Sequence, residues 1–234
     1  MRRHTAVALA ALSVVGFTVP RAGATQDVPR PVAGGGIFVP EWKGRIDAQE
    51  ERRGAALDQS KLVQEGAALH VTTGPAVIYW NPANVVSGDY TVKATFREPK
   101  YMNLNDHPHP YGIVIAGNDL GTDQPSLLYC ATYGNGNVIV RGFGPQPFQL
   151  NGHGGERNAA VHKAAGPGQP VGQEIAVSVK GDKITCAVNG TVIGSYDKAA
   201  VVTAGRLKST DGIYGIRFAH NTEGLVTGLT LTKP

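Results

Sequence analysis

Two histidines in one short segment are the residues of this 234-residue chain that most plainly suggest chemistry. His107 and His109 flank Pro108, and an extended segment places alternate side chains on the same side. Paired imidazoles of this kind suit contact with a ligand, and they are also common metal ligands. We expect ligand contact here, with no bound metal and no cofactor. Calcium is an alternative, through the oxygen donors Asn103, Asn105, Asp106, Asn118, Asp119 and Asp123.

The carboxylates do not form the pair that a glycosidase would carry on one strand. Hydrolysis of a glycoside normally needs two carboxyl groups, and on a strand these would stand two residues apart, facing one groove. No two Asp or Glu residues in the sequence have that spacing. Acids from separate strands or loops could still converge, and these are Asp89, Asp119, Glu156, Asp211 and Glu223. If the chain is an enzyme, His220 with Asp119 is the catalytic pair that we would test.

Tyrosines and arginines offer a second kind of site. In the run from Leu127 to Tyr133, the alternation that sends Leu128 and Cys130 inward sends Tyr129 and Tyr133 to the opposite face, and Arg141 follows them on the next run. Aromatic rings lie against the C–H patches of a sugar, and arginine bonds to its oxygens. We therefore expect a carbohydrate groove formed by Tyr129, Tyr133, Arg141 and Arg217, with His107, His109 and Asn118 at its edge.

The elements that would position these residues are strands. Between Gln173 and Asp197, three runs with period-two alternation are separated by Gly181-Asp182 and Asn189-Gly190, which predicts an antiparallel meander. Further strands are expected over 68–72, 76–80, 90–97, 112–116, 127–133, 138–143, 213–219 and 226–232. A helical turn is expected only between Gln49 and Leu62. About eleven short strands predict an all-β fold, a two-sheet antiparallel β-sandwich of jelly-roll type.

The two cysteines, Cys130 and Cys186, both fall in predicted strands with their side chains turned to the core. Neighbouring strands would allow a disulfide easily, whereas opposite sheets, roughly 10 Å apart, would require local distortion. Two buried thiols are the alternative, since free cysteine packs as a small apolar residue. The sequence leaves this choice open.

The first residues have the features of an export signal. Arg2 and Arg3 precede an apolar run from Ala6 to Val19, and Ala22-Gly23-Ala24 is a typical cleavage site. We expect residues 1–24 to be a signal peptide, 25–37 a flexible linker that does not pack, and 38–234 one domain of an exported, periplasmic or extracellular protein. The apolar run is too short for a membrane span. Without Arg2, Arg3 and Arg21 the formal charge falls from +4 to +1, so no basic surface suggests nucleic acid as a partner.

A long segment from Pro145 to Pro170 interrupts the regular spacing of strands. A connection of this length without secondary structure is uncommon in a compact domain unless it is functional or disordered. It is interpreted as a lid over a groove or, alternatively, as a mobile surface excursion.

The chain resembles the concanavalin A-like lectin/glucanase superfamily, and more narrowly the 3-keto-disaccharide hydrolase domain family. The resemblance spans residues 38–234. Its motifs are EWKG at 41–44, the strand 89–98, YGI at 111–113 followed by GND at 117–119, Tyr129 before a hairpin over 134–140, VSVKGDKITCAVNGTVI at 177–193, and GIYGIR at 212–217. The resemblance implies a sandwich of laminin G-like type that binds or processes carbohydrate.

The chain departs from that family at two points. Arg217 stands where hydrolase-like members have glutamine, and Leu225 to Leu229 lacks the carboxylate that usually opens their last strand. We therefore place carbohydrate binding first. Hydrolysis of glycosides or 3-keto-disaccharides is the second hypothesis, and an interaction module like the laminin G domains is the third.

Overall fold

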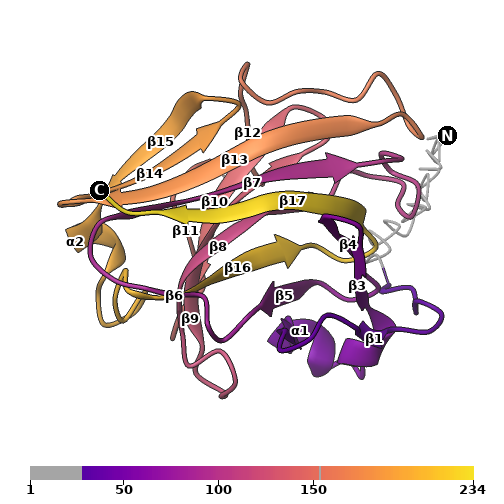
Figure 1. Ribbon diagram of the computed structural model, residues 1–234, viewed down its shortest axis with the longest axis horizontal. Coiled ribbons are helices and arrows are strands. Elements are labelled where there is room, and N and C mark those ends of the chain that lie inside the picture. The colour runs from indigo at the N-terminus through magenta and orange to yellow at the C-terminus, as the bar shows by residue number, and fades with distance from the viewer. Residues whose placement is uncertain (1–27, 153) are drawn as a thin grey trace, which may run out of the picture.

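The computed structural model describes residues 28–152 and 154–234, so the predicted signal peptide lies outside the described residues. Two β-sheets stack face to face and enclose the main core (Figure 1). The predicted all-β sandwich is therefore confirmed. In the described part of the chain, no helix is both long and apolar enough to cross a membrane.

The first sheet has eight strands, and the second half of the chain supplies one end of it. Its order is β1 (Gly36–Ile37), β3 (Lys61–Glu65), β4 (Ala68–Thr72), β17 (Glu223–Thr232), β7 (Tyr90–Glu98), β13 (Val171–Lys180), β14 (Lys183–Val188) and β15 (Thr191–Asp197). The predicted meander is β13, β14 and β15. Gly181, Asn189 and Gly190 have φ values of 55°, 49° and 81°, as the tight turns between these strands require.

The second sheet carries the candidate site. Its order is β11 (Phe148–Gln149), β10 (Asn137–Phe143), β9 (Ser126–Tyr133), β8 (Pro110–Asn118), β16 (Gly212–Phe218), β5 (Val77–Trp80) and β2 (Lys43–Ile46), while β12 (Glu156–Arg157) pairs with β10 and β6 (Val85–Val86) with β16. Three single turns complete the fold: α1 (Ala48–Glu51), η1 (Leu57–Gln59) and α2 (Lys198–Val201). A helical turn is predicted only between Gln49 and Leu62; η1 lies inside this window, and α1 begins one residue before it.

A disulfide joins the two sheets. Cys130 on β9 is bonded to Cys186 on β14, with 6.2 Å between their Cα atoms. This separation lies within the usual range for disulfides, although the two residues belong to opposite sheets. The bridge closes the sandwich through the middle of its core.

Two sequence expectations need correction. The segment expected to be an unpacked linker is attached to the domain in its described part, because Arg30 N donates to Asn221 Oδ1 at 2.7 Å and β1 pairs with β3. The segment 145–170 is not structureless, since β11 and β12 both pair with β10. Val161, 3% exposed, and Phe148, 8% exposed, fix it to the core. These two apolar residues hold the segment against the domain, and its strands β11 and β12 lie along the β10 edge of the second sheet.

Candidate functional site

The candidate site lies on the outer face of the second sheet, opposite the main core. Alternation along β9 sends Leu128 and Cys130 into that core and Tyr129 to the outer face, as predicted. Tyr129 is paired with Val114 on β8 and with Arg141 on β10. A second apolar cluster covers this face, made of Ile78, Trp80, Val114, Leu120, Leu127, Tyr129, Ala131 and Ile139. Tyr133, Phe143 and Ile213, which are partly buried, pack against this cluster.

An ion pair between Arg217, which is buried, and Asp47 joins this face to the start of α1. The two guanidinium nitrogens of Arg217 on β16 donate to Asp47 at 2.7 and 2.6 Å, in a bidentate arrangement. Its guanidinium carbon lies 4.8 Å from the ring centre of Tyr129 and 5.1 Å from that of Phe143. Burial alone would lower the pKa of Arg217, but Asp47 raises it above its usual value. Because Asp47 begins α1, this pair fastens α1 to the sheet.

Beside this ion pair the outer face is hollowed by a groove of about 340 Å³, here called the arginine groove. Cations predominate among its charged residues, since four arginines line it with two aspartates. The charged and aromatic residues of its lining are Arg45, Arg52, Arg141, Arg217, Asp47, Asp123 and Phe143. Arg141 lies over the Phe143 ring, 5.4 Å from its centre. The groove therefore combines positive charge with an aromatic wall.

A second hollow of about 500 Å³, here called the tryptophan groove, adjoins the first. Its wall includes Trp42 and Trp80, which are both tryptophans of the chain. It shares Arg45 and Asp123 with the arginine groove, so these two residues stand where the hollows meet. Both volumes fall in or near the range that holds small ligands.

Tyr129 and Tyr133, the two tyrosines predicted to line the groove, differ in exposure. Tyr129 is on the predicted face but only 3% exposed, and it supports Arg217 from below. This corrects its expected role as a contact residue, because the guanidinium and the Phe143 ring cover it. Tyr133 is half-buried, and burial raises its pKa to about 12. Arg141 is the residue of this predicted group that lines the groove with part of its surface exposed.

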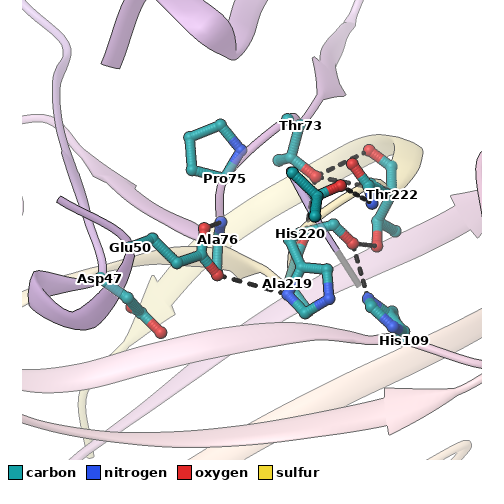
Figure 2. A network of polar contacts seen from close by, with 12 residues as sticks. Asp47, Glu50, Thr73, Pro75, Ala76, His109, Ala219, His220 and Thr222 are labelled. Carbon is teal, nitrogen blue, oxygen red and sulfur yellow. Dashed lines mark hydrogen bonds and ion pairs between the residues drawn. The ribbon is translucent and has the colours of Figure 1, made fainter. Parts of the chain in front are cut away.

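His107, His109 and His220 come together at one end of the same sheet. The ring centres of His107 and His109 are 4.4 Å apart, and those of His109 and His220 are 4.1 Å apart. Figure 2 shows His220 between Glu50 on α1 and His109, with its Nδ1 3.3 Å from Glu50 Oε1. Glu50 Oε2 also accepts a hydrogen bond from the backbone nitrogen of Ala76 at 2.7 Å. The turn α1 thus connects this histidine cluster to the arginine groove through Glu50 and Asp47.

Asn118 and Asp119 lie at the other end of β8, away from the histidines. Since β8 has nine residues, His109 before it and Asp119 after it are separated by roughly 30 Å. The proposed pairing of His220 with Asp119 is therefore wrong, and Asp119 forms an ion pair with Lys208 instead. The Asn118 amide donates to the carbonyls of Ala116 at 3.1 Å and Asp211 at 2.9 Å, which is a structural role.

Sequence reasoning missed Trp42, Trp80, Asp47 and Glu50. Trp80 alternates with Tyr79 in a run where all four residues are buried, so periodicity did not show which side faces outward. The two carboxylates stand three residues apart around a single helical turn, whereas two acids on one face of a strand would stand two apart. The rarity of tryptophan in this chain was the one signal that could have identified Trp42 and Trp80.

Comparison with known proteins identifies the fold. No family model matches the chain, and no curated protein matches its sequence. A Bacillus subtilis protein of unknown function with a galectin-like fold superposes with a TM-score of 0.53 and 8% identity, covering 82% of this chain and 88% of that one. The carbohydrate-binding module CBM66 from Bacillus subtilis gives a TM-score of 0.41 at 6% identity, over 85% of this chain and 99% of the module.

Sheep galectin-11, solved with glycerol, gives a TM-score of 0.42 at 15% identity, over 63% of this chain and 93% of the galectin. At such identities these likenesses concern architecture, and they do not reach the narrower 3-keto-disaccharide hydrolase family. The chain is a two-sheet β-sandwich with a galectin-like fold.

Proposed function

We propose that this protein binds a carbohydrate in the joined arginine and tryptophan grooves on the outer face of its second sheet. The observation that carries the proposal is the placement of Trp42 and Phe143, both partly exposed, with Arg141 along two adjacent hollows that share Arg45 and Asp123. Trp80, 6% exposed, lies in the wall of the tryptophan groove. Aromatic side chains offer flat surfaces to the C–H faces of sugar rings. Arginine supplies directed hydrogen bonds to their oxygens.

The charges of the groove favour an acidic sugar. Arg217 is neutralised by Asp47, but Arg45 bonds to the uncharged carbonyls of Leu120 and Thr122 and so keeps its positive charge. Arg52, Arg141 and Lys43 add three more cations, against Asp123 and Glu51 as the other acids that line the two grooves. An oligosaccharide that bears carboxylates, such as a uronic acid oligomer, would match this charge. Arginine forms its strongest hydrogen bonds with such groups.

Binding is favoured over hydrolysis by the contacts of Asp47 and Glu50, the two carboxylates that α1 brings beside Arg217 and His220. Both oxygens of Asp47 accept hydrogen bonds from Arg217, and both oxygens of Glu50 are engaged, by His220 and by the backbone of Ala76. A glycosidase needs one carboxyl group that can give a proton and another that can attack or activate water. Hydrolysis, and a protein-binding role like that of laminin G modules, are therefore outcomes that the experiment below distinguishes.

An exported location is part of the proposal. The disulfide between Cys130 and Cys186 supports it, because such bonds persist in oxidising compartments. Carbohydrates with free carboxylates are also accessible outside the cytoplasm.

The test is a titration followed by tryptophan fluorescence, since both tryptophans line the site. Oligogalacturonates and neutral oligosaccharides of equal length are the ligands. We expect saturable binding of the acidic series, weakened about tenfold or more by Arg141→Gln, which removes a charged hydrogen bond. Arg157→Gln, at an exposed position on β12 outside both grooves, is the matched control and should bind like the wild type.

Three results would count against the proposal. Equal binding of neutral and acidic sugars would remove the role of the arginines. Shortened products in the incubation would replace binding with hydrolysis. Failure of all sugars, with the fold intact by circular dichroism, would leave the protein-interaction alternative.

A further inference from the structure

The topology of the second sheet brings three histidines to one point. Tyr111 on β8 is paired with Phe218 on β16, and the two strands are antiparallel. His109 stands two residues before Tyr111 and His220 two residues after Phe218, so they meet beyond the ends of the paired strands. His107 joins them through the turn at Pro108. One ring nitrogen from each of the three lies within 4.8 Å of the others.

Each histidine is held at Nδ1 by an oxygen atom. His107 Nδ1 is 2.7 Å from Asp106 Oδ1, His109 Nδ1 is 2.6 Å from the carbonyl oxygen of His220, and His220 Nδ1 is 3.3 Å from Glu50 Oε1. Histidines that bind metals through one nitrogen usually hold a carboxylate or carbonyl with the other, which fixes the ring. All three rings here have that outer contact.

In each neutral ring, the nitrogen that carries the proton determines whether the other nitrogen has a lone pair with which to bind a metal. A carbonyl oxygen only accepts hydrogen bonds, so His109 carries its proton on Nδ1, and the carboxylate of Asp106 requires the same of His107. In their neutral forms both rings then present a lone pair at Nε2. The two Nε2 atoms are 2.7 Å apart. Two lone pairs at this distance repel each other, unless one ring is protonated and donates a hydrogen bond to the other or a metal ion lies against both.

We propose that His107, His109 and His220 bind one divalent transition-metal ion, with zinc as the ion that this ligand set suits best. Three imidazoles favour zinc and its neighbours over calcium or magnesium, which prefer oxygen. Zinc–nitrogen bonds of about 2.0–2.1 Å require nitrogens roughly 3.3 Å apart in a tetrahedral site. The two Nε2 atoms, 2.7 Å apart, would therefore open by about 0.6 Å, and the wider separations in the trio, which lies within 4.8 Å, would close. This replaces the expectation, drawn from the sequence, of no metal.

The site would have an open side. His109 is 8% exposed and anchors the base of the cluster, whereas the His107 side chain is 53% exposed. Three protein ligands leave a fourth position for water or for an oxygen of a bound molecule. The site is separate from the two grooves, so the inference does not depend on the proposed carbohydrate binding.

The test is a metal titration of the untagged protein after treatment with a chelator. Zn²⁺ binding is measured by calorimetry, and Co²⁺ binding by the visible absorption that a four-coordinate cobalt site produces. We expect one ion per chain. His107→Gln should weaken Zn²⁺ binding about 100-fold or more, and Asp106→Asn, which disturbs only the outer contact, about 10-fold to 100-fold.

His162→Gln is the matched control, because His162 is exposed, lies outside the cluster and contacts the carbonyl of Gly172. It should bind Zn²⁺ like the wild type. The inference is overturned if the folded protein binds no Zn²⁺ or Co²⁺, or if His107→Gln leaves the affinity unchanged. Equal losses in His107→Gln and His162→Gln would overturn it too, since they would show binding by scattered surface histidines. His220→Gln provides a second ligand variant in case His107→Gln fails to fold.

Discussion

Removal of the Asp47 carboxylate should destabilise the protein through the charge that it leaves behind. The Arg217 side chain is 7% exposed and that of Asp47 is 26% exposed, so Asp47→Ala leaves a buried guanidinium without its carboxylate. Breaking a buried pair in this way typically costs 3–5 kcal/mol. Because water can approach from the Asp47 side, we expect about 3 kcal/mol for Asp47→Ala.

Substitution of Arg217, the partner of Asp47, should affect the free energy of unfolding differently. Arg217→Met removes the buried charge and leaves Asp47, which is the more exposed member, and methionine packs well against the rings of Tyr129 and Phe143. The double variant Asp47→Ala/Arg217→Met should recover most of the loss, to within about 1 kcal/mol of the wild type. A double-mutant cycle isolates the coupling between the two residues.

The assay is urea unfolding of all four proteins at pH 7, followed by far-ultraviolet circular dichroism. Equal slopes against urea would show that the variants expose the same surface on unfolding, so that midpoints can be compared. If Asp47→Ala is within about 0.5 kcal/mol of the wild type, or if the two single losses simply add in the double variant, the ion pair does not fasten α1 as argued.

Two further predictions concern stability. The double variant Cys130→Ala/Cys186→Ala should lose about 4 kcal/mol in urea unfolding, the chain-entropy value for a loop of 56 residues, and an unchanged midpoint would contradict the bridge between the sheets. Glu98 is 6% exposed, and burial raises its pKa from 4.5 to about 7, a shift worth about 3 kcal/mol. Between pH 4.5 and about 7 the native state therefore binds more protons than the unfolded chain. The stabilisation that comes from the protonated Glu98 carboxyl is complete below pH 4.5 and is lost as the pH rises through about 7. Glu98→Gln should accordingly be about 3 kcal/mol more stable than the wild type at pH 8 and gain little at pH 4; a difference that does not change with pH would refute this.

The fold could be predicted because its signals are local. Alternation at period two and the Asn189-Gly190 turn are written in consecutive residues, and β4 and β13 to β15 follow them closely. The same alternation correctly predicted that the side chains of Tyr129 and Arg141 lie on one face of the sheet. What alternation does not report is whether a face is covered, and Tyr129 proved to be buried by residues distant in sequence.

The site could be predicted only in part because its contacts are long-range. Arg217 and Asp47 are 170 residues apart, and nothing near either residue indicates the other. His107 and His109 were recognisable as a pair, but His220 joins them only through the register of β8 against β16. The two-residue strands β11 and β12 likewise lack a pattern long enough to be read, since their pairing depends on β10.

The central claim, that carbohydrate binds across the joined grooves, is tested most directly by nuclear magnetic resonance of the two tryptophan indoles. Both indole N–H signals can be followed separately in a ¹⁵N-labelled protein, since the chain has only two tryptophans. During titration with an oligogalacturonate, the indole signals of Trp42 and Trp80 should shift together with the side-chain N–H of Arg141 and saturate at the same ligand concentration. Saturable binding that leaves all three signals unmoved would place the ligand elsewhere and contradict the account.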